Sequence, residues 1–217
     1  MSDAAAGSAA LDVSGVTHVF FDIGGVLGTN GWDTEQRRAA ATKFGLDEAD
    51  LTRRHKEVAD AWETGRMTFD EYLDIIVFHA ARPFTKDEFR RYMLELSAPW
   101  EDSVAVVRDL AAGDRVRLYT LNNESEELNL HRIERFGLRG LFEAFCSSCW
   151  LGVRKPSRQI YHRAFAIAQA EPARSLFVDD RQPNLEPAAA LGCRTHLFTG
   201  ADALRAAVAP LLARDPR

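Results

Sequence analysis

The sequence predicts an α/β protein with a Rossmann-like parallel-sheet core and an inserted helical cap domain. In residues 101–217, short apolar segments alternate with helical patterns, which is typical of a parallel sheet with right-handed crossovers. Residues 29–100 instead contain about four helical patterns and no convincing strand. The 217 residues, 46% of them hydrophobic, are enough for one sizeable core and a modest inserted module.

Five short segments have the composition of buried strands, and each of the later ones is followed by a helical pattern. The strands are expected at 16–21, 116–120, 144–146, 175–178 and 195–198. The helices of the core are expected at 101–112, 124–136, 157–170, 184–191 and 201–213.

The cap is recognised by the residues that begin and end its helices. Gly45, Gly65 and Pro83 follow helical patterns, whereas Thr68 and Thr85 are typical N-caps. The cap helices are therefore expected at 34–44, 48–64, 68–80 and 86–96. This divides the chain into a core at 15–28 and 101–217 and a cap at 29–100. Residues 1–14 are rich in Ala, Gly and Ser, and we expect them to form a flexible tail.

Composition excludes several classes of function. The net charge of -5 and the scattered basic residues argue against nucleic-acid binding, and no apolar run is long enough to span a membrane. Three cysteines are too few for a disulfide framework, so we expect a cytoplasmic protein. The Cys146 and Cys149 pair has no second pair to complete a zinc site, which favours a structural role. The sequence gives no prediction of oligomeric state.

Polar side chains follow the ends of three predicted strands, where an open parallel sheet binds its ligands. Asp22 ends the first strand, and a carboxylate can attack phosphorus to form an acyl phosphate. Mg²⁺ prefers one or two carboxylates, which Asp22 and Asp180 can supply. Lys155 adds a positive charge, and groups near Asn122 can bind the phosphoryl oxygens.

The chain resembles the haloacid-dehalogenase-like hydrolase superfamily from about residue 16 to 200. The resemblance is carried by four motifs in the expected order: Phe21-Asp22-Ile23-Gly24-Gly25-Val26-Leu27, Tyr119-Thr120-Leu121-Asn122-Asn123, Lys155-Pro156, and Phe177-Val178-Asp179-Asp180-Arg181 with Asn184. Each motif alone is weak, but four in order are specific.

The resemblance implies a Mg²⁺-dependent phosphatase for a small phosphorylated metabolite, acting through an aspartyl-phosphate. Asp22 would be the nucleophile and a metal ligand, with Lys155 as its catalytic partner and a phosphate contact. The Gly24 carbonyl, Asp179 and Asp180 would complete the metal site. In the cap, Asn30 and Trp32 follow the first motif closely and are candidates for substrate contact.

Two departures from the family pattern bear on function. Phosphatases of the family usually carry an Asp as general acid and base where this chain has Gly24. In the second motif, the family has a Ser or Thr whose hydroxyl binds phosphate. Two alignments that differ by one residue place Leu121 or Thr120 at that position, so Thr120 and Asn122 are both phosphate-binding candidates.

The missing acid keeps two other functions open. A 2-haloacid dehalogenase also uses an Asp nucleophile, needs no proton for its halide leaving group and needs no Mg²⁺, whereas the Asp179-Asp180 pair favours the phosphatase. The third hypothesis is a catalytically weak binding or regulatory protein, because Gly24 replaces the usual general acid. Retention of Asp22, Lys155 and Asp180 argues against it.

Overall fold

The core of the protein is a five-stranded, all-parallel sheet. The computed structural model describes residues 11–212. The strands are β1 (His18–Phe21), β2 (Arg117–Asn122), β3 (Ala144–Ser147), β4 (Ser175–Asp179) and β5 (Arg194–Leu197). They lie in the order β3-β2-β1-β4-β5, with every neighbouring pair parallel. The predicted α/β class is confirmed, and β1 lies at the centre of the sheet.

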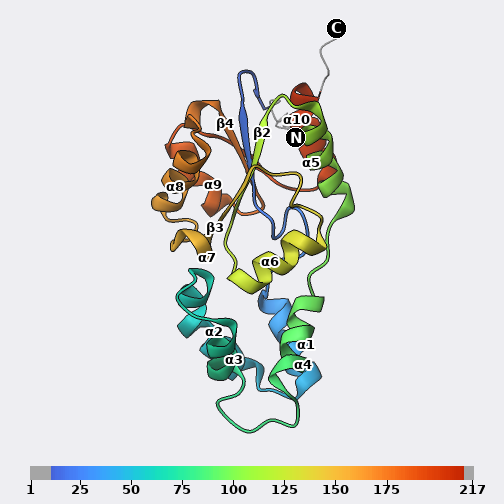
Figure 1. Ribbon diagram of the computed structural model, residues 1–217, viewed down its shortest axis with the longest axis vertical. Coiled ribbons are helices and arrows are strands. Elements are labelled where there is room, and N and C mark those ends of the chain that lie inside the picture. The colour runs from blue at the N-terminus through green and yellow to red at the C-terminus, as the bar shows by residue number, and fades with distance from the viewer. Residues whose placement is uncertain (1–10, 213–217) are drawn as a thin grey trace, which may run out of the picture.

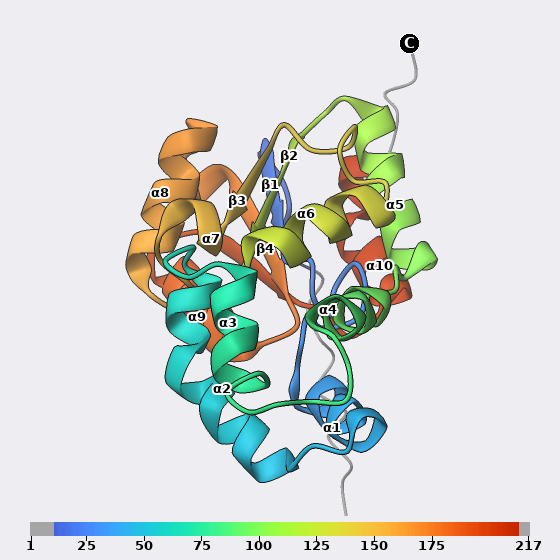
Figure 2. The same cartoon turned by 60° about the horizontal axis from the view of Figure 1, so that its bottom comes forward.

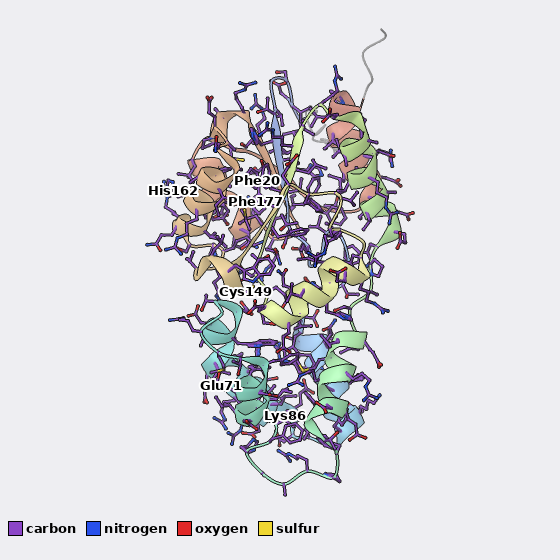
Figure 3. The ribbon with its side chains drawn as sticks, in the orientation of Figure 1. Phe20, Glu71, Lys86, Cys149, His162 and Phe177 are labelled. Carbon is purple, nitrogen blue, oxygen red and sulfur yellow. The ribbon has the colours of Figure 1, made fainter. Side chains whose placement is uncertain are left out.

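Helices cover both faces of this sheet (Figure 1). On one face, α5 (Glu101–Gly113) packs against α10 (Ala201–Leu212). On the other lie α8 (Arg158–Ala168) and α9 (Gln182–Ala190). Because successive side chains of a strand point to opposite faces, Phe21 joins the α5–α10 core and Phe20 joins the α8–α9 core. Figure 3 shows Phe20 beside Phe177 in the latter core.

Four helices between β1 and α5 form a separate layer beyond one end of the sheet (Figure 2). They are α1 (Thr34–Phe44), α2 (Glu48–Glu63), α3 (Phe69–Ile76) and α4 (Lys86–Glu95). Thr68 and Thr85 each form a capping box, with Glu71 and Glu88, which fixes where α3 and α4 begin. The layer has its own aromatic core, in which Trp62 stacks on Tyr72 with ring centroids 3.8 Å apart.

The core contacts this helical layer through α6 (Glu126–Arg135) and α7 (Ser148–Leu151). Leu128 of α6 is part of the layer's apolar core, and α7 packs against α2. The short helix α7 was not predicted, because four residues are too few to show helical periodicity. A 3₁₀ turn, Pro172–Arg174, precedes β4.

The predicted tail is wrong for residues 11–14. Val13 is buried in the α5–α10 core, and the carbonyl of Ser14 accepts a hydrogen bond from Arg194. The anchoring of residues 11–14 could not be predicted from this Ala- and Gly-rich sequence, because one apolar side chain gives no periodic pattern. Residues 1–10 of the predicted tail, and residue 213 of the last predicted helix, lie outside the described residues.

Helix lengths differ from expectation by a few residues at several ends. The third cap helix ends at Ile76 rather than residue 80, and α6 begins at Glu126 rather than residue 124. Among the helices of residues 11–212, none is long and apolar enough to cross a membrane.

Candidate active site

Asp22 lies at the carboxyl edge of the sheet, directly after the central strand. Its backbone N–H donates to the carbonyl of Val178 at 2.9 Å, which continues the β1–β4 ladder by one residue. Its Oδ1 accepts from the N–H of Ile23 at 2.8 Å. Because β4 is the neighbour of β1, Asp22 lies beside Asp179 and Asp180.

Lys155 connects two of these carboxylates. Its Nζ lies 2.9 Å from Asp22 Oδ2 and 2.6 Å from Asp179 Oδ2, and its side chain is almost completely buried. Asn123 holds the backbone of Lys155 at two points. It accepts from the Lys155 N–H at 2.8 Å and donates to the Lys155 carbonyl at 2.9 Å. The side chain of Asn123 therefore positions the lysine, a role that the sequence did not predict.

Burial dominates the electrostatics of this group. Burial raises the pKa of Asp22 to about 7, opposed by the positive charge of Lys155 and reinforced by Asp179. Burial alone would lower the pKa of Lys155, but the two carboxylates raise it above its ordinary value. The lysine is thus protonated at neutral pH.

The carboxylates of Asp22, Asp179 and Asp180 could hold a metal ion. One oxygen from each lies within 4.8 Å of the others, and Asp180 Oδ1 is buried without a hydrogen-bond partner in residues 11–212. Among residues 11–212, Lys155 is the one side chain that forms an ion pair with any of the three carboxylates, and it does not pair with Asp180. Burial and Asp179 raise the pKa of Asp180. An orphaned oxygen and uncompensated negative charge fit a hard divalent cation.

The three carboxylates are not equivalent. Asp179 is fully buried, and its oxygens already accept from Lys155, from Asn184 Nδ2 and from the N–H of Arg181. Its geometry therefore suits positioning of Lys155, leaving Asp22 and Asp180 as the accessible ligands. Gly25 makes room for Asp180: its φ is +75°, and a Cβ there would come within 2.3 Å of Asp180 Oδ2.

A cavity of about 770 Å³ opens above Asp22, between the sheet edge and the helical layer. The layer's first segment contributes Asn30, Trp32 and Arg37, and α2 contributes His55 and Glu63. Asn30 and Trp32, the predicted cap contacts, both line it. Its other lining residues include Asp22, Gly24, Asn123, Arg132, Arg154, Lys155 and Asp180.

Thr120 and Asn122 do not reach this cavity, contrary to the prediction that they bind phosphate. Asn122 donates to Asn129 at 2.9 Å and accepts from Ser147 at 2.9 Å. Thr120 is completely buried. Side chains alternate along β2, so both lie on the face opposite Leu121, which packs in the α8–α9 core. The sequence could not show which residues of the strand face the site.

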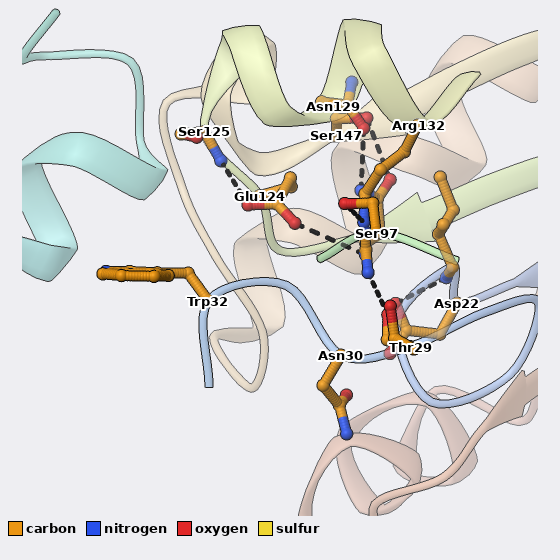
Figure 4. A network of polar contacts seen from close by, with 12 residues as sticks. Asp22, Thr29, Asn30, Trp32, Ser97, Glu124, Ser125, Asn129, Arg132 and Ser147 are labelled. Carbon is orange, nitrogen blue, oxygen red and sulfur yellow. Dashed lines mark hydrogen bonds and ion pairs between the residues drawn. The ribbon is translucent and has the colours of Figure 1, made fainter. Parts of the chain in front are cut away.

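A buried arginine lies at the cavity wall instead. Arg132 of α6 donates to the carbonyl of Thr29 and to Ser97 Oγ, and it pairs with Glu124 at 3.5 Å (Figure 4). Burial raises the pKa of Glu124 to about 7, although Arg132 opposes the shift. In the sequence, Arg132 looks like one of many basic residues on a helix, and only its packing distinguishes it.

The cap and core are joined next to Lys155. Arg154 pairs with Glu63 at the end of α2 at 2.6 Å, and Ser148 Oγ donates to the Glu63 carbonyl at 2.6 Å. Both contacts join the sheet domain to the same turn of the cap. They connect the cap to the core at the edge of the cavity.

The sequence matches the family model for haloacid dehalogenase-like hydrolases over residues 16–192. A search of curated proteins found no significant match.

Several solved structures share the fold at low sequence identity. A protein described as a predicted HAD-like family hydrolase from Porphyromonas gingivalis has a TM-score of 0.73 at 21% identity, covering 92% of this chain and 99% of that one. The HAD family enzyme BT-2542 from Bacteroides thetaiotaomicron, in complex with magnesium and inorganic phosphate, has a TM-score of 0.71 at 20% identity, covering 83% and 93%.

A third relative is a dehalogenase. The L-2-haloacid dehalogenase from Xanthobacter autotrophicus, with chloropropionic acid covalently bound, has a TM-score of 0.59 at 16% identity, covering 90% and 83%. The match of the family model over most of the chain shows that this protein belongs to the haloacid dehalogenase-like hydrolases.

Proposed function

We propose that the protein is a Mg²⁺-dependent phosphatase that hydrolyses a small phosphate ester through an aspartyl-phosphate on Asp22. The observation that carries the proposal is the cluster of Asp22, Asp179 and Asp180, in which Lys155 pairs with the first two and Asp180 Oδ1 has no hydrogen-bond partner among residues 11–212. A dehalogenase needs no Mg²⁺, so the Asp179–Asp180 pair, which could help to hold that ion, favours the phosphatase. BT-2542, which shares the fold, was crystallised with magnesium and inorganic phosphate.

Each residue has a defined part in the reaction. A carboxylate oxygen of Asp22 attacks phosphorus, the bond to the ester oxygen breaks, and the leaving oxygen takes a proton from water. Water then attacks the phosphorus of the aspartyl-phosphate, which releases inorganic phosphate and restores the carboxylate. The ammonium of Lys155 orients Asp22 and neutralises charge on the transferring group.

Mg²⁺, held by Asp22 and Asp180 with the Gly24 carbonyl as a further candidate ligand, would screen the repulsion between phosphate and carboxylate when bound. The cap limits the ester to a small molecule, because the Glu63–Arg154 contact closes the cavity on one side. We place the enzyme in the cytoplasm on the basis of its cysteine content.

The absence of an acid at position 24 favours a second candidate function. A 2-haloacid dehalogenase would use Asp22 on carbon, and its halide leaves without a proton. L-2-haloacid dehalogenases share the fold, with TM-scores of 0.59–0.61. This function would not depend on Mg²⁺.

Phosphate release with Mg²⁺ or with chelator tests the two functions against each other. The panel should contain p-nitrophenyl phosphate, whose leaving group needs little protonation, and alkyl phosphates of small metabolites. We expect Mg²⁺-dependent release that is lost in Asp22→Asn. Halide release from 2-chloropropionate in the presence of chelator, without phosphate release from any ester, would replace the phosphatase with the dehalogenase.

A further inference from the structure

The cap wall of the cavity contains a buried arginine that forms no ion pair with any residue of the described range 11–212. Arg37 of α1 lines the cavity and is only 6% exposed. Its Nη1 donates to the Trp32 carbonyl and its Nη2 to Thr34 Oγ1 at 3.1 Å, and both acceptors are uncharged. Within residues 11–212 its Nε is buried with no hydrogen-bond partner, and the guanidinium forms no ion pair. The charges of Asp33 and Glu63 act on it from farther away and only partly offset the lowering of its pKa by burial. The guanidinium is therefore incompletely satisfied.

The other buried cations of the cavity differ from Arg37 in this respect. Lys155 pairs with Asp22 and Asp179, and Arg132 pairs with Glu124. Arg154, which is more exposed, pairs with Glu63. A buried charge normally has a partner, because desolvation of an unpaired ion is costly. The cavity-facing position of Arg37 allows a ligand to supply that partner.

His55 of α2 adds a neutral donor to the same wall. The indole N–H of Trp32 can only donate, so the Tyr72 oxygen accepts from it at 2.7 Å. The Tyr72 O–H is then free to donate to His55 Nδ1, 2.7 Å away. Burial, reinforced by nearby Arg37 and Arg154, lowers the pKa of His55 to about 3. The imidazole therefore carries its proton on Nε2, the nitrogen left for a ligand in the cavity.

We propose that Arg37 and His55 form a subsite for a second anionic group on the substrate, a carboxylate or a second phosphate. The inference rests on the proposed function, which puts the reacting phosphate at Asp22 on the opposite wall. A guanidinium binds planar or tetrahedral oxyanions with charge-assisted hydrogen bonds, and an imidazole N–H can donate one more. The substrate class is then a small phosphate ester that also bears an acidic group.

Three phosphonates on a two-carbon linker test the subsite without turnover. They are 3-phosphonopropionate, its neutral amide 3-phosphonopropionamide, and ethane-1,2-diylbisphosphonate, each titrated calorimetrically into the wild-type protein with Mg²⁺. We expect at least one of the two acidic ligands to bind about tenfold or more tightly than the amide. The acid that does so identifies the second group as carboxylate or phosphate. Equal affinities for all three would overturn the proposal.

Variants assign the preference to its residues. Arg37→Gln should reduce the acid-to-amide affinity ratio to near one while the affinity for the amide changes less than about threefold. Lys56→Gln, which removes another cation of the same cavity, is the matched control and should keep the ratio. If Arg37→Gln does not fold, His55→Phe should still lower the ratio severalfold. A ratio unchanged in the folded Arg37→Gln protein, or in His55→Phe, would contradict the subsite.

The two proposals fail separately. Selective binding of an acidic phosphonate without phosphate release from any ester would keep the subsite and remove the phosphatase. Phosphate release without any preference for the acidic ligands would keep the phosphatase and remove the subsite.

Discussion

Arg132 lies beside Gly24, so that a Cβ on residue 24 would be 3.3 Å from Arg132 Nη1. Phosphatases of the family that this chain resembles usually carry an acid at this position. Here an acid would come next to a buried guanidinium, which is anchored by Thr29, Ser97 and Glu124. An opposite charge at this range favours the ionised form of a carboxyl and lowers its pKa.

Gly24→Asp is therefore expected to be a poor general acid. A well-placed general acid contributes about 10²–10⁴-fold to rate, but an Asp paired with Arg132 stays ionised. We expect Gly24→Asp to raise kcat/KM for alkyl phosphates by less than about tenfold relative to Gly24→Asn, the neutral control. A gain of about 100-fold would show that Arg132 does not suppress the acid.

Lys155→Met should destabilise the protein in the absence of metal. Removal of one partner of a buried ion pair costs about 3–5 kcal/mol, since Asp22 and Asp179 would be left buried and unpaired. Urea unfolding in chelator measures this loss. Lys56→Met, at an exposed lysine with no ion pair in the described structure, should change stability by less than about 0.5 kcal/mol.

The loss in Lys155→Met should also depend on pH. The pKa of Asp22 is already raised to about 7 with the lysine present, and loss of the positive charge raises it further. A carboxyl with a raised folded-state pKa favours the protonated form, so its ionisation costs stability as pH rises from about 4 through the folded-state pKa. The deficit should be smaller at pH 5 than at pH 8. A deficit that grows on acidification would contradict this account.

Mg²⁺ should stabilise the folded protein through Asp180. A ligand at ten times its Kd adds about 1.4 kcal/mol, which raises the Tm of a chain of this length by about 3–5 °C. Thermal melts with Mg²⁺ and with chelator measure the shift. Asp180→Asn should abolish most of it, whereas Asp202→Asn, at an exposed carboxylate on α10, should retain it. An equal shift in both variants would place the metal elsewhere.

His55 should remain neutral, with its proton on Nε2, well below neutral pH. Its pKa of about 3 and the hydrogen bond from Tyr72 both favour this form. Long-range ¹H–¹⁵N spectra should show Nδ1 as the unprotonated nitrogen from pH 8 to pH 5. Tyr72→Phe removes the donor to Nδ1 and should produce a mixture of tautomers. Protonation of His55 near pH 6 in the wild-type protein would contradict the assignment.

Most of the fold could be predicted from the sequence because it depends on local patterns. All five strands and the four cap helices lie where apolar periodicity and residues such as Thr68, Thr85 and Gly45 indicate. The proximity of Asp22 and Asp180 could be predicted because parallel strands bring their carboxyl ends to one edge. Lys155 follows α7 and not a strand, and it was predicted from its motif. The anchoring of Val13 in the α5–α10 core could not be predicted, since a single apolar residue forms no periodic hydrophobic pattern.

The sequence by itself determined the fold class, the inserted cap and the carboxylates with their lysine, because these follow from periodicity, helix caps and strand order. Only the tertiary structure decided that Asn122 faces α6, that Arg132 faces Gly24, and that Arg37 and His55 share the cap wall. These relationships join side chains from different helices or different domains. Their contacts depend on how the elements pack, and local sequence does not encode which face of a strand or helix meets a distant partner.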